Sequence, residues 1–136
     1  MITAVDTNVI LDALTGEAPF AGPSQEAMLT CAADGSLIVC DVVWAETVAW
    51  FRSADSMEAT MQRLDLRFVA SSTATAEAAG LAWRLYRSEG GPRERVLPDF
   101  LVGAHAMIQA DRLLTRDRGF FRRYFDSLRI VDLATP

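Results

Sequence analysis

The chain has 136 residues, of which 51% are hydrophobic, and carries a formal net charge of −5. This length suits one domain, spanning residues 1–136, with its own core, and no segment is repetitive or low in complexity. No apolar run reaches the ~18 residues of a membrane span and no basic segment precedes an apolar one at the N-terminus, so we expect a cytoplasmic protein without a signal peptide.

All 13 basic residues are arginines, and they are distributed unevenly. Residues 1–68 contain three arginines against ten acids, whereas residues 69–136 contain ten arginines against eight acids. A guanidinium presents a planar fork that matches phosphate oxygens, so the second half favours contact with a polyanion. A general preference for Arg codons would explain the missing Lys but not this clustering.

Short strands alternate with helices along the chain. Strands are predicted over residues 2–5, 37–40, 67–69, 112–114 and 129–131. Helices are predicted over residues 9–14, 24–34, 43–53, 55–64, 73–88 and 98–110. This alternation predicts an α/β domain with a mainly parallel sheet of about five short strands flanked by helices, because right-handed crossovers place helices on both faces.

Three of the predicted helices carry signals for an end or a face. Residues 43–53 are apolar nearly all round, so this helix should be mostly buried. Residues 55–58 resemble a capping box that opens the next helix. The helix over residues 73–88 places Leu81 and Leu85 on its apolar face.

The two cysteines lie in apolar segments, which indicates buried, reduced thiols, and two Cys with one His make no zinc-binding spacing.

Acidic side chains recur where the predicted strands end, which is the edge at which α/β folds bind ligands. Asp6 ends the first strand, and Asp41 ends the second, with Glu46 one turn into the following helix. Asp99 opens the helix after Pro98, and Asp117 follows the fourth strand. Each acid alone is explained as a cap or a partner of a helix dipole. Together they favour a common site, and Glu46 most of all, because an all-apolar helix would bury an unpaired carboxylate.

Such a site has a defined chemistry. Clustered carboxylates raise each other's pKa values, and a bound divalent cation relieves their repulsion. Ligands that are all oxygen select Mg²⁺ or Mn²⁺. These ions supply a water nucleophile for attack on phosphorus, and two of them hold both the attacking and the leaving oxygen. The sequence therefore predicts hydrolysis of a phosphodiester, with the Arg-rich half holding the polyanion.

Four stretches resemble, in order and spacing, the motifs of PIN-domain ribonucleases: VDTNVILD, Glu46 in WAETV, LPDFLVGAHA and LLTRDRGFF. The resemblance extends from Ile2 to about Phe125 and to the small toxins of VapBC-type toxin–antitoxin modules. It implies a parallel sheet flanked by helices. It also implies Mg²⁺- or Mn²⁺-dependent endonucleolytic cleavage of RNA, often tRNA or ribosomal RNA, and a small antitoxin that blocks the site.

The resemblance carries over to individual positions. It implies four metal-binding, catalytic acids: Asp6, Glu46, Asp99 and Asp117. Asn8 and Thr115 match its supporting polar positions. Because none of the four acids is missing, we expect an active enzyme.

Other residues near these motifs have competing interpretations. The arginines after Thr115 form either a solvated surface or phosphate contacts, and their position beside Asp117 favours substrate binding for Arg116 and Arg118. His105 is six positions after Asp99 on one helix and so points about 120° away from it, which favours a structural role.

An apolar concentration in the middle of the chain is read either as core or as an interface. Its members are Trp44, Trp50, Phe51, Met57 and Met61. A chain of this length does not easily bury so many large side chains beside a full set of sheet-facing residues. We therefore expect part of the set to bind an antitoxin or a second copy of the chain in a homodimer.

Two other functions are compatible with the pattern. Phosphotransfer through an aspartyl phosphate, as in haloacid-dehalogenase-type phosphatases or receiver domains, uses a Lys that this chain lacks, and the phosphatases need an Asp where Asn8 stands. A non-catalytic RNA-binding module would not need the intact set of acids. Metal-dependent cleavage of mixed RNA separates all three functions.

Overall fold

The computed structural model describes residues 1–16, 19–92 and 95–133, without the side chain of Arg118. Its strands are β1 (Ile2–Val5), β2 (Ser36–Val39), β3 (Leu66–Phe68), β4 (Arg112–Leu114) and β5 (Ile130–Val131). They form one parallel sheet in the order β3-β2-β1-β4-β5. The predicted parallel sheet of five short strands is confirmed.

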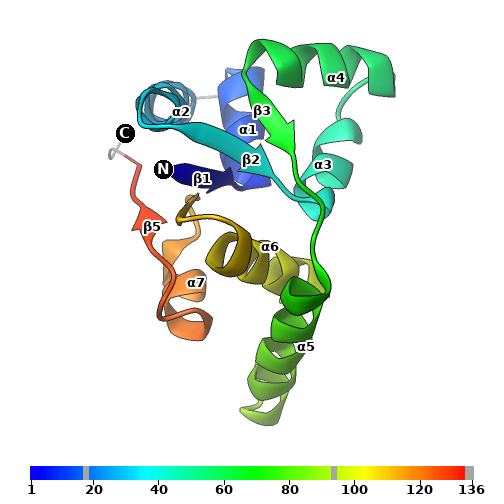
Figure 1. Ribbon diagram of the computed structural model, residues 1–136, viewed down its shortest axis with the longest axis vertical. Helices are drawn as coiled ribbons and strands as arrows, with labels where there is room; N and C mark the ends of the chain where they lie inside the picture. Colours follow the sequence, from blue (N-terminus) through cyan, green and yellow to red (C-terminus); the bar gives the residue numbers. More distant parts are fainter. Residues whose placement is uncertain (17–18, 93–94, 134–136) are drawn as a thin grey trace.

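The helices of the described residues are α1 (Thr7–Thr15), α2 (Ala21–Ala33), α3 (Asp41–Val48), α4 (Ala54–Arg63), α5 (Thr73–Ser88), α6 (Leu97–Gln109) and α7 (Arg118–Tyr124). Figure 1 shows α1, α2 and α4 on one side of the sheet and α5, α6 and α7 on the other. Within this part of the chain, no helix has the length and apolar character needed to cross a membrane.

The direction of strand addition reverses between β1 and β4. β2 and β3 extend the sheet on one side of β1, whereas β4 and β5 extend it on the other. Because the crossovers have one hand, this reversal sends the two sets of helices to opposite faces. It also leaves a crevice beyond the carboxyl ends of the two central strands, where Asp6 follows β1 and Thr115 follows β4.

The core lies on both faces of the sheet, as a parallel sheet covered by helices requires. Val39 and Leu114 are fully buried in the strands, and Phe100 is fully buried in α6. Met57 and Met61 are also fully buried, because α4 packs through them against the edge strand β3. These two methionines therefore belong to the core, and the predicted interface does not include them.

Trp50 differs from the rest of that apolar set, because 69% of its surface is exposed. Phe51 is half-buried, and Trp44 packs edge-on against Phe68 with ring centroids 5.3 Å apart. The core accommodates most of the large side chains after all, and Trp50 is the member that stays available to a partner.

The helix predicted over residues 43–53 is shorter and less buried than expected. α3 runs from Asp41 to Val48, and only Val43 and Thr47 are buried. The helix lies at the end of the sheet and contacts α1, α4 and α6, so its other side faces solvent. An apolar sequence on all sides did not produce a helix buried on all sides.

Two further expectations about helices are corrected. The N-cap of α4 is Ser53, whose Oγ accepts the backbone N–H of Ser56 at 3.1 Å, and Asp55 lies in the first turn. In α5, Leu81 and Leu85 are 56% and 54% exposed. The helix packs against α6 through Thr75, Ala79 and Tyr86 on another face.

His105 and the two cysteines are buried inside this framework. The Nε2–H of His105 donates to the backbone carbonyl of Val69 at 2.8 Å, and burial lowers the pKa of the ring. The predicted structural role of His105 is confirmed. Cys31 and Cys40 are free, buried thiols, as predicted, and burial raises the pKa of Cys40 to about 11.

Candidate active site

Asp6 lies at the carboxyl end of β1 and caps α1. Its Oδ1 accepts the backbone N–H of Thr7 at 2.8 Å, and its Oδ2 accepts the hydroxyl of Thr115 at 2.8 Å. Burial raises the pKa of Asp6 to about 6 against the effect of these two hydrogen bonds, and the charges of Glu46 and Asp99 add to the rise. A carboxyl whose pKa lies this far above its ordinary range, at the crevice of an α/β sheet, marks a candidate functional site.

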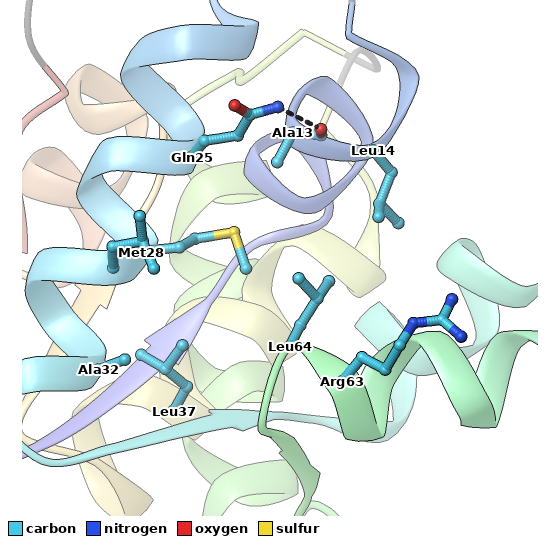
Figure 2. Close-up of a pocket in the computed structure, with 9 residues that line it drawn as sticks. Ala13, Leu14, Gln25, Met28, Ala32, Leu37, Arg63 and Leu64 are labelled. Carbon is cyan, nitrogen blue, oxygen red and sulfur yellow. Dashed lines mark hydrogen bonds between the residues drawn. The ribbon is translucent and has the colours of Figure 1, made fainter.

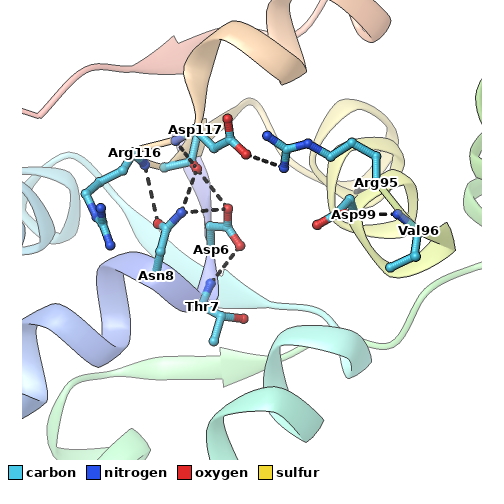
Figure 3. Close-up of polar contacts among 9 residues, drawn as sticks. Asp6, Thr7, Asn8, Arg95, Val96, Asp99, Arg116 and Asp117 are labelled. Atoms are coloured by element: carbon cyan, nitrogen blue, oxygen red, sulfur yellow. Dashed lines mark hydrogen bonds and ion pairs between the residues drawn. The ribbon is translucent and has the colours of Figure 1, made fainter. Parts of the chain in front are cut away.

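Asn8 and Thr115 join the end of β4 to the end of β1 through hydrogen bonds. Figure 3 shows Asn8 between Asp6 and Arg116. The Asn8 Nδ2 lies 3.5 Å from both Asp6 Oδ2 and Thr115 Oγ1, and the Asn8 Oδ1 accepts the backbone N–H of Arg116 at 3.3 Å. The buried Thr115 hydroxyl also accepts the backbone N–H of Asp117 at 3.0 Å. One hydroxyl therefore fixes the position of Asp117 relative to Asp6.

Glu46 reaches the same place through Thr7. The Thr7 hydroxyl donates to Glu46 Oε1 at 2.8 Å, while the Thr7 backbone N–H is bound to Asp6. Glu46 is exposed, so the expectation of a carboxylate buried on an all-apolar helix is wrong. The reason is that α3 presents this side to solvent, and what makes Glu46 notable is its charge beside Asp6.

A guanidinium lies among the remaining acids (Figure 3). Arg95 forms an ion pair with Asp117 and lies over the ring of Phe120, 4.4 Å from its centroid. Partial burial opposes the charged form, but the bond to Asp117 and the charges of Asp117 and Asp99 raise the pKa of Arg95 above its ordinary value. Asp99 itself accepts the backbone N–H of Val96 at 3.3 Å in the first turn of α6.

Arg95 is a residue that the sequence motifs did not identify. Its only signal was its position four residues before Asp99, in the connection between α5 and α6. Of the two predicted substrate-binding arginines, Arg116 pairs with Asp12 at 2.6 Å and lies over the ring of Phe20. Arg118 begins α7, and its side chain is outside the described part of the structure.

The oxygen donors at this site are chemically suited to a hard divalent cation. The carboxylates, the Thr115 hydroxyl and the Asn8 amide are the oxygen donors that Mg²⁺ and Mn²⁺ prefer. As the described side chains stand, no three Asp, Glu, His or Cys residues are grouped closely enough to hold a metal ion. Arg95 supplies the positive charge at Asp117 instead. The acids around Asp6 thus suit a cation in their chemistry, and at Asp117 Arg95 would compete with a metal ion for Oδ2.

A second opening lies away from the acids, between α1, α2, β2 and α4 (Figure 2). It has a volume of about 360 Å³ and is lined mainly by apolar side chains: Leu14, Met28, Leu29, Leu37 and Leu64. Leu29 is 74% exposed on α2 at this groove. The arrangement provides apolar surface with no part in the acidic site.

A family model described as the PIN domain matches residues 3–126 of the chain. No curated protein matches the sequence significantly. The family match covers each of the four acids.

Three solved structures illustrate the similarity of fold. One, VapBC2 from Rickettsia felis bound to a DNA fragment from its promoter, is 17% identical, with a TM-score of 0.76 over 98% of this chain and 100% of that chain. VapBC-1 from nontypeable Haemophilus influenzae is 16% identical, with a TM-score of 0.73 over 97% and 98% of the two chains. A toxin–antitoxin complex from Klebsiella pneumoniae is 19% identical, with a TM-score of 0.68 over 95% of each chain. At these identities the similarity shows a shared fold.

Proposed function

Because the chain belongs to the PIN-domain family, we propose that it is a metal-dependent endoribonuclease and the toxin of a toxin–antitoxin pair. The observation that carries the proposal is the site itself. The pKa of Asp6 is raised to about 6, in part by the charges of Glu46 and Asp99. The Thr115 hydroxyl donates to Asp6 and accepts the backbone N–H of Asp117. These elements gather at the crevice where open parallel sheets bind ligands.

The proposed metal ligands are the four acids: Asp6, Glu46, Asp99 and Asp117. A Mg²⁺ or Mn²⁺ ion bound there would activate water and polarise a phosphoryl oxygen. The rest of the site positions these acids. The Thr115 hydroxyl and the Thr7 amide orient the two oxygens of Asp6, and Thr7 also orients Glu46. Asn8 holds the backbone that leads from Thr115 to Asp117.

The proposed substrate is RNA, with tRNA and ribosomal RNA as the expected classes, and the expected compartment is the cytoplasm. The charge distribution supports a polyanionic substrate, because ten arginines lie in the half of the chain that carries Asp99 and Asp117. Arg116 is paired with Asp12 through its Nε, so its terminal nitrogens are the proposed contact with RNA.

The proposed protein partner is a cognate antitoxin. Similar solved structures are described as VapBC or toxin–antitoxin complexes. The apolar groove of Figure 2, with Leu14 and Leu29 at its surface, gives such a partner a place to bury side chains. The exposed Trp50 is the proposed contact with the antitoxin or with a second copy in a homodimer.

The test is cleavage of mixed RNA by the purified protein with Mn²⁺ or Mg²⁺ and with chelator. Wild type should cleave only with metal, and Asp6→Asn should lose most of that activity. Asp55→Asn is the matched control, because Asp55 is an exposed acid in the first turn of α4. Full activity in chelator, or a wild-type rate in Asp6→Asn, would contradict the proposal.

A further inference from the structure

A cleft distinct from the apolar groove adjoins the acidic site on the side of Asp117. It has a volume of about 410 Å³ and lies between the end of α5, the described residues that follow it (90–92 and Arg95), and α7. Its described lining includes Gly91, Pro92, Arg95, Phe120, Arg123 and Tyr124. Arg95 belongs to both places, because it lines this cleft and pairs with Asp117. A ligand in the cleft therefore lies next to the acids.

Two described arginines line the cleft, Arg95 and Arg123, and Arg95 is paired with Asp117. Arg95 lies over the ring of Phe120, and Arg123 lies over the ring of Tyr124, 5.5 Å from its centroid. Glu89 is an acid at the rim. Each ring restricts the guanidinium above it, so less side-chain freedom is lost when an anion binds.

Arg123 stands out among the arginines near Asp117. Arg116 is paired with Asp12, and Arg122 is paired with Asp132 at 3.1 Å. Arg123 is exposed and makes no ion pair with any described residue. Among the described side chains, none therefore forms an ion pair that neutralises its charge at the cleft.

We propose that this cleft binds the phosphate and base of the nucleotide next to the scissile bond of a single-stranded RNA. The proposal rests on the proposed nuclease function and adds a subsite to it. A polyanion that enters a site with four acids meets like charge, so it needs cationic side chains beside them. Arg95 and Arg123 supply these charges, and bases stack well on aromatic rings and guanidinium planes such as those at the walls.

Arg95 has two competing anionic partners in this arrangement. In the structure it pairs with Asp117, and with RNA in the cleft it would turn to the phosphate. Binding of RNA would then free Asp117 for a divalent cation. Arg95 is therefore a positioning residue: whether RNA occupies the cleft decides whether Asp117 is paired with Arg95 or available to a divalent cation.

The test is binding of a fluorescein-labelled, mixed-sequence RNA 12-mer, followed by fluorescence anisotropy at several salt concentrations. Ca²⁺ replaces Mn²⁺ in the buffer, and a gel checks that the probe stays intact. The variants are Arg123→Gln, Arg123→Lys and Arg87→Gln. Arg87 is a matched control, because it is also exposed and lies over a ring, that of Trp83, but does not line the cleft.

One phosphate contact on single-stranded RNA contributes a slope of about 0.7 in the plot of log affinity against log salt. Arg123→Gln should lower the slope by about that amount and weaken binding about fivefold at 0.1 M salt. Arg123→Lys should restore the slope, because it keeps the charge, and Arg87→Gln should match wild type.

The outcomes separate the subsite from the nuclease function. If wild type cleaves RNA with Mn²⁺ but Arg123→Gln binds the probe with an unchanged slope, the subsite is wrong and the nuclease function stands. If wild type neither binds the probe nor cleaves RNA, both are wrong. Loss of antitoxin binding in Arg123→Gln without loss of RNA binding would make the cleft a protein site and overturn the proposal.

Discussion

The hydroxyl of Thr115 donates a 2.8 Å hydrogen bond to Asp6, although 109 positions separate the two residues in sequence. The contact forms because β1 and β4 are parallel neighbours in the sheet and end at the same edge. Thr115 is also the acceptor for the backbone N–H of Asp117. A single hydroxyl thus lowers the pKa of one acid and positions another.

Thr115→Val should raise the pKa of Asp6 further above about 6, because a hydrogen bond to the carboxylate is lost. It should also lower stability by about 1–3 kcal/mol, since the Asp117 N–H loses its acceptor. Titration of the Asp6 carboxyl by ¹³C NMR measures the first effect and urea unfolding the second. Thr115→Ser keeps the hydroxyl and should resemble wild type, and an unchanged Asp6 pKa in the valine variant would show that the bond is not formed in solution.

The stability of the metal-free protein should fall as pH rises from about 4 to about 6. Over this range the unfolded chain releases the Asp6 proton, at a pKa of about 3.8, while the folded chain retains it up to about 6. The difference corresponds to about 3 kcal/mol lost by neutral pH. Asp6→Asn keeps a residue that caps helices well and removes this loss.

Thermal melts in chelator at pH 3.5 and pH 7 test this dependence. The asparagine variant should gain stability relative to wild type between the two pH values, by roughly 1–3 kcal/mol after any change in hydrogen bonding. Comparing the two proteins at each pH removes the contribution of other groups, such as Asp41, whose hydrogen bonds with Ser71 lower its pKa despite partial burial. Equal responses to pH would mean that Asp6 ionises normally.

The strands and several helices were predictable because their signals are local. β1, β4 and α5 have the predicted bounds, since a short apolar run or a capped amphipathic segment defines each of them. Joining these elements into a parallel sheet followed from their alternation. The gathering of polar groups at one sheet edge followed from the direction that parallel strands share.

What sequence could not supply was the orientation of helices and long side chains. Leu81 and Leu85 form an apolar face of α5, but the helix buries another face against α6. Glu46 is exposed because α3 lies at the end of the sheet. The periodicity of the helix predicts neither its position nor the exposure of Glu46. The pairing of Arg95 with Asp117 depends on how the start of α6 lies against the end of β4, which no local pattern specifies.

Each of the other three acids should also be needed for cleavage. Glu46→Gln, Asp99→Asn and Asp117→Asn should each lose most RNA cleavage and any growth arrest that expression causes. The expected reason is loss of negative charge where a divalent cation would bind. Asp126→Asn, an exposed acid after α7, is a control for the loss of one charge. A variant that cleaves at the wild-type rate would remove its residue from the site.

Arg95→Gln should bind Mn²⁺ more tightly than wild type. The arginine competes for Asp117 and repels a cation, so its removal should favour Mn²⁺ by about 1 kcal/mol, or roughly fivefold. Titration calorimetry without RNA measures this, with Arg87→Gln as the control for net charge. Weaker Mn²⁺ binding in Arg95→Gln would mean that Arg95 organises the acids rather than competing for them.

Leu29→Glu should weaken binding of a cognate antitoxin by at least about tenfold and leave RNA cleavage by the free toxin unchanged. The substitution places a charge at the apolar groove of α1, α2 and α4, away from the acids. Leu81→Glu introduces the same charge at another exposed leucine, which lies on α5 outside the groove, and serves as the control. Undiminished copurification of the antitoxin with Leu29→Glu would move its binding surface elsewhere.

The burial of Cys31 and Cys40 has a practical consequence for following motion at the cleft. Neither thiol is at the surface, and with a pKa of about 11 Cys40 is almost wholly protonated at neutral pH. Thiol-reactive probes should therefore leave the folded wild-type protein unlabelled. Arg87→Cys, on α5 outside the cleft, or Arg52→Cys, two positions after Trp50, would introduce one addressable sulfur on an exposed position, so a dye or spin label could report RNA or antitoxin binding without replacing any native cysteine or a proposed contact residue.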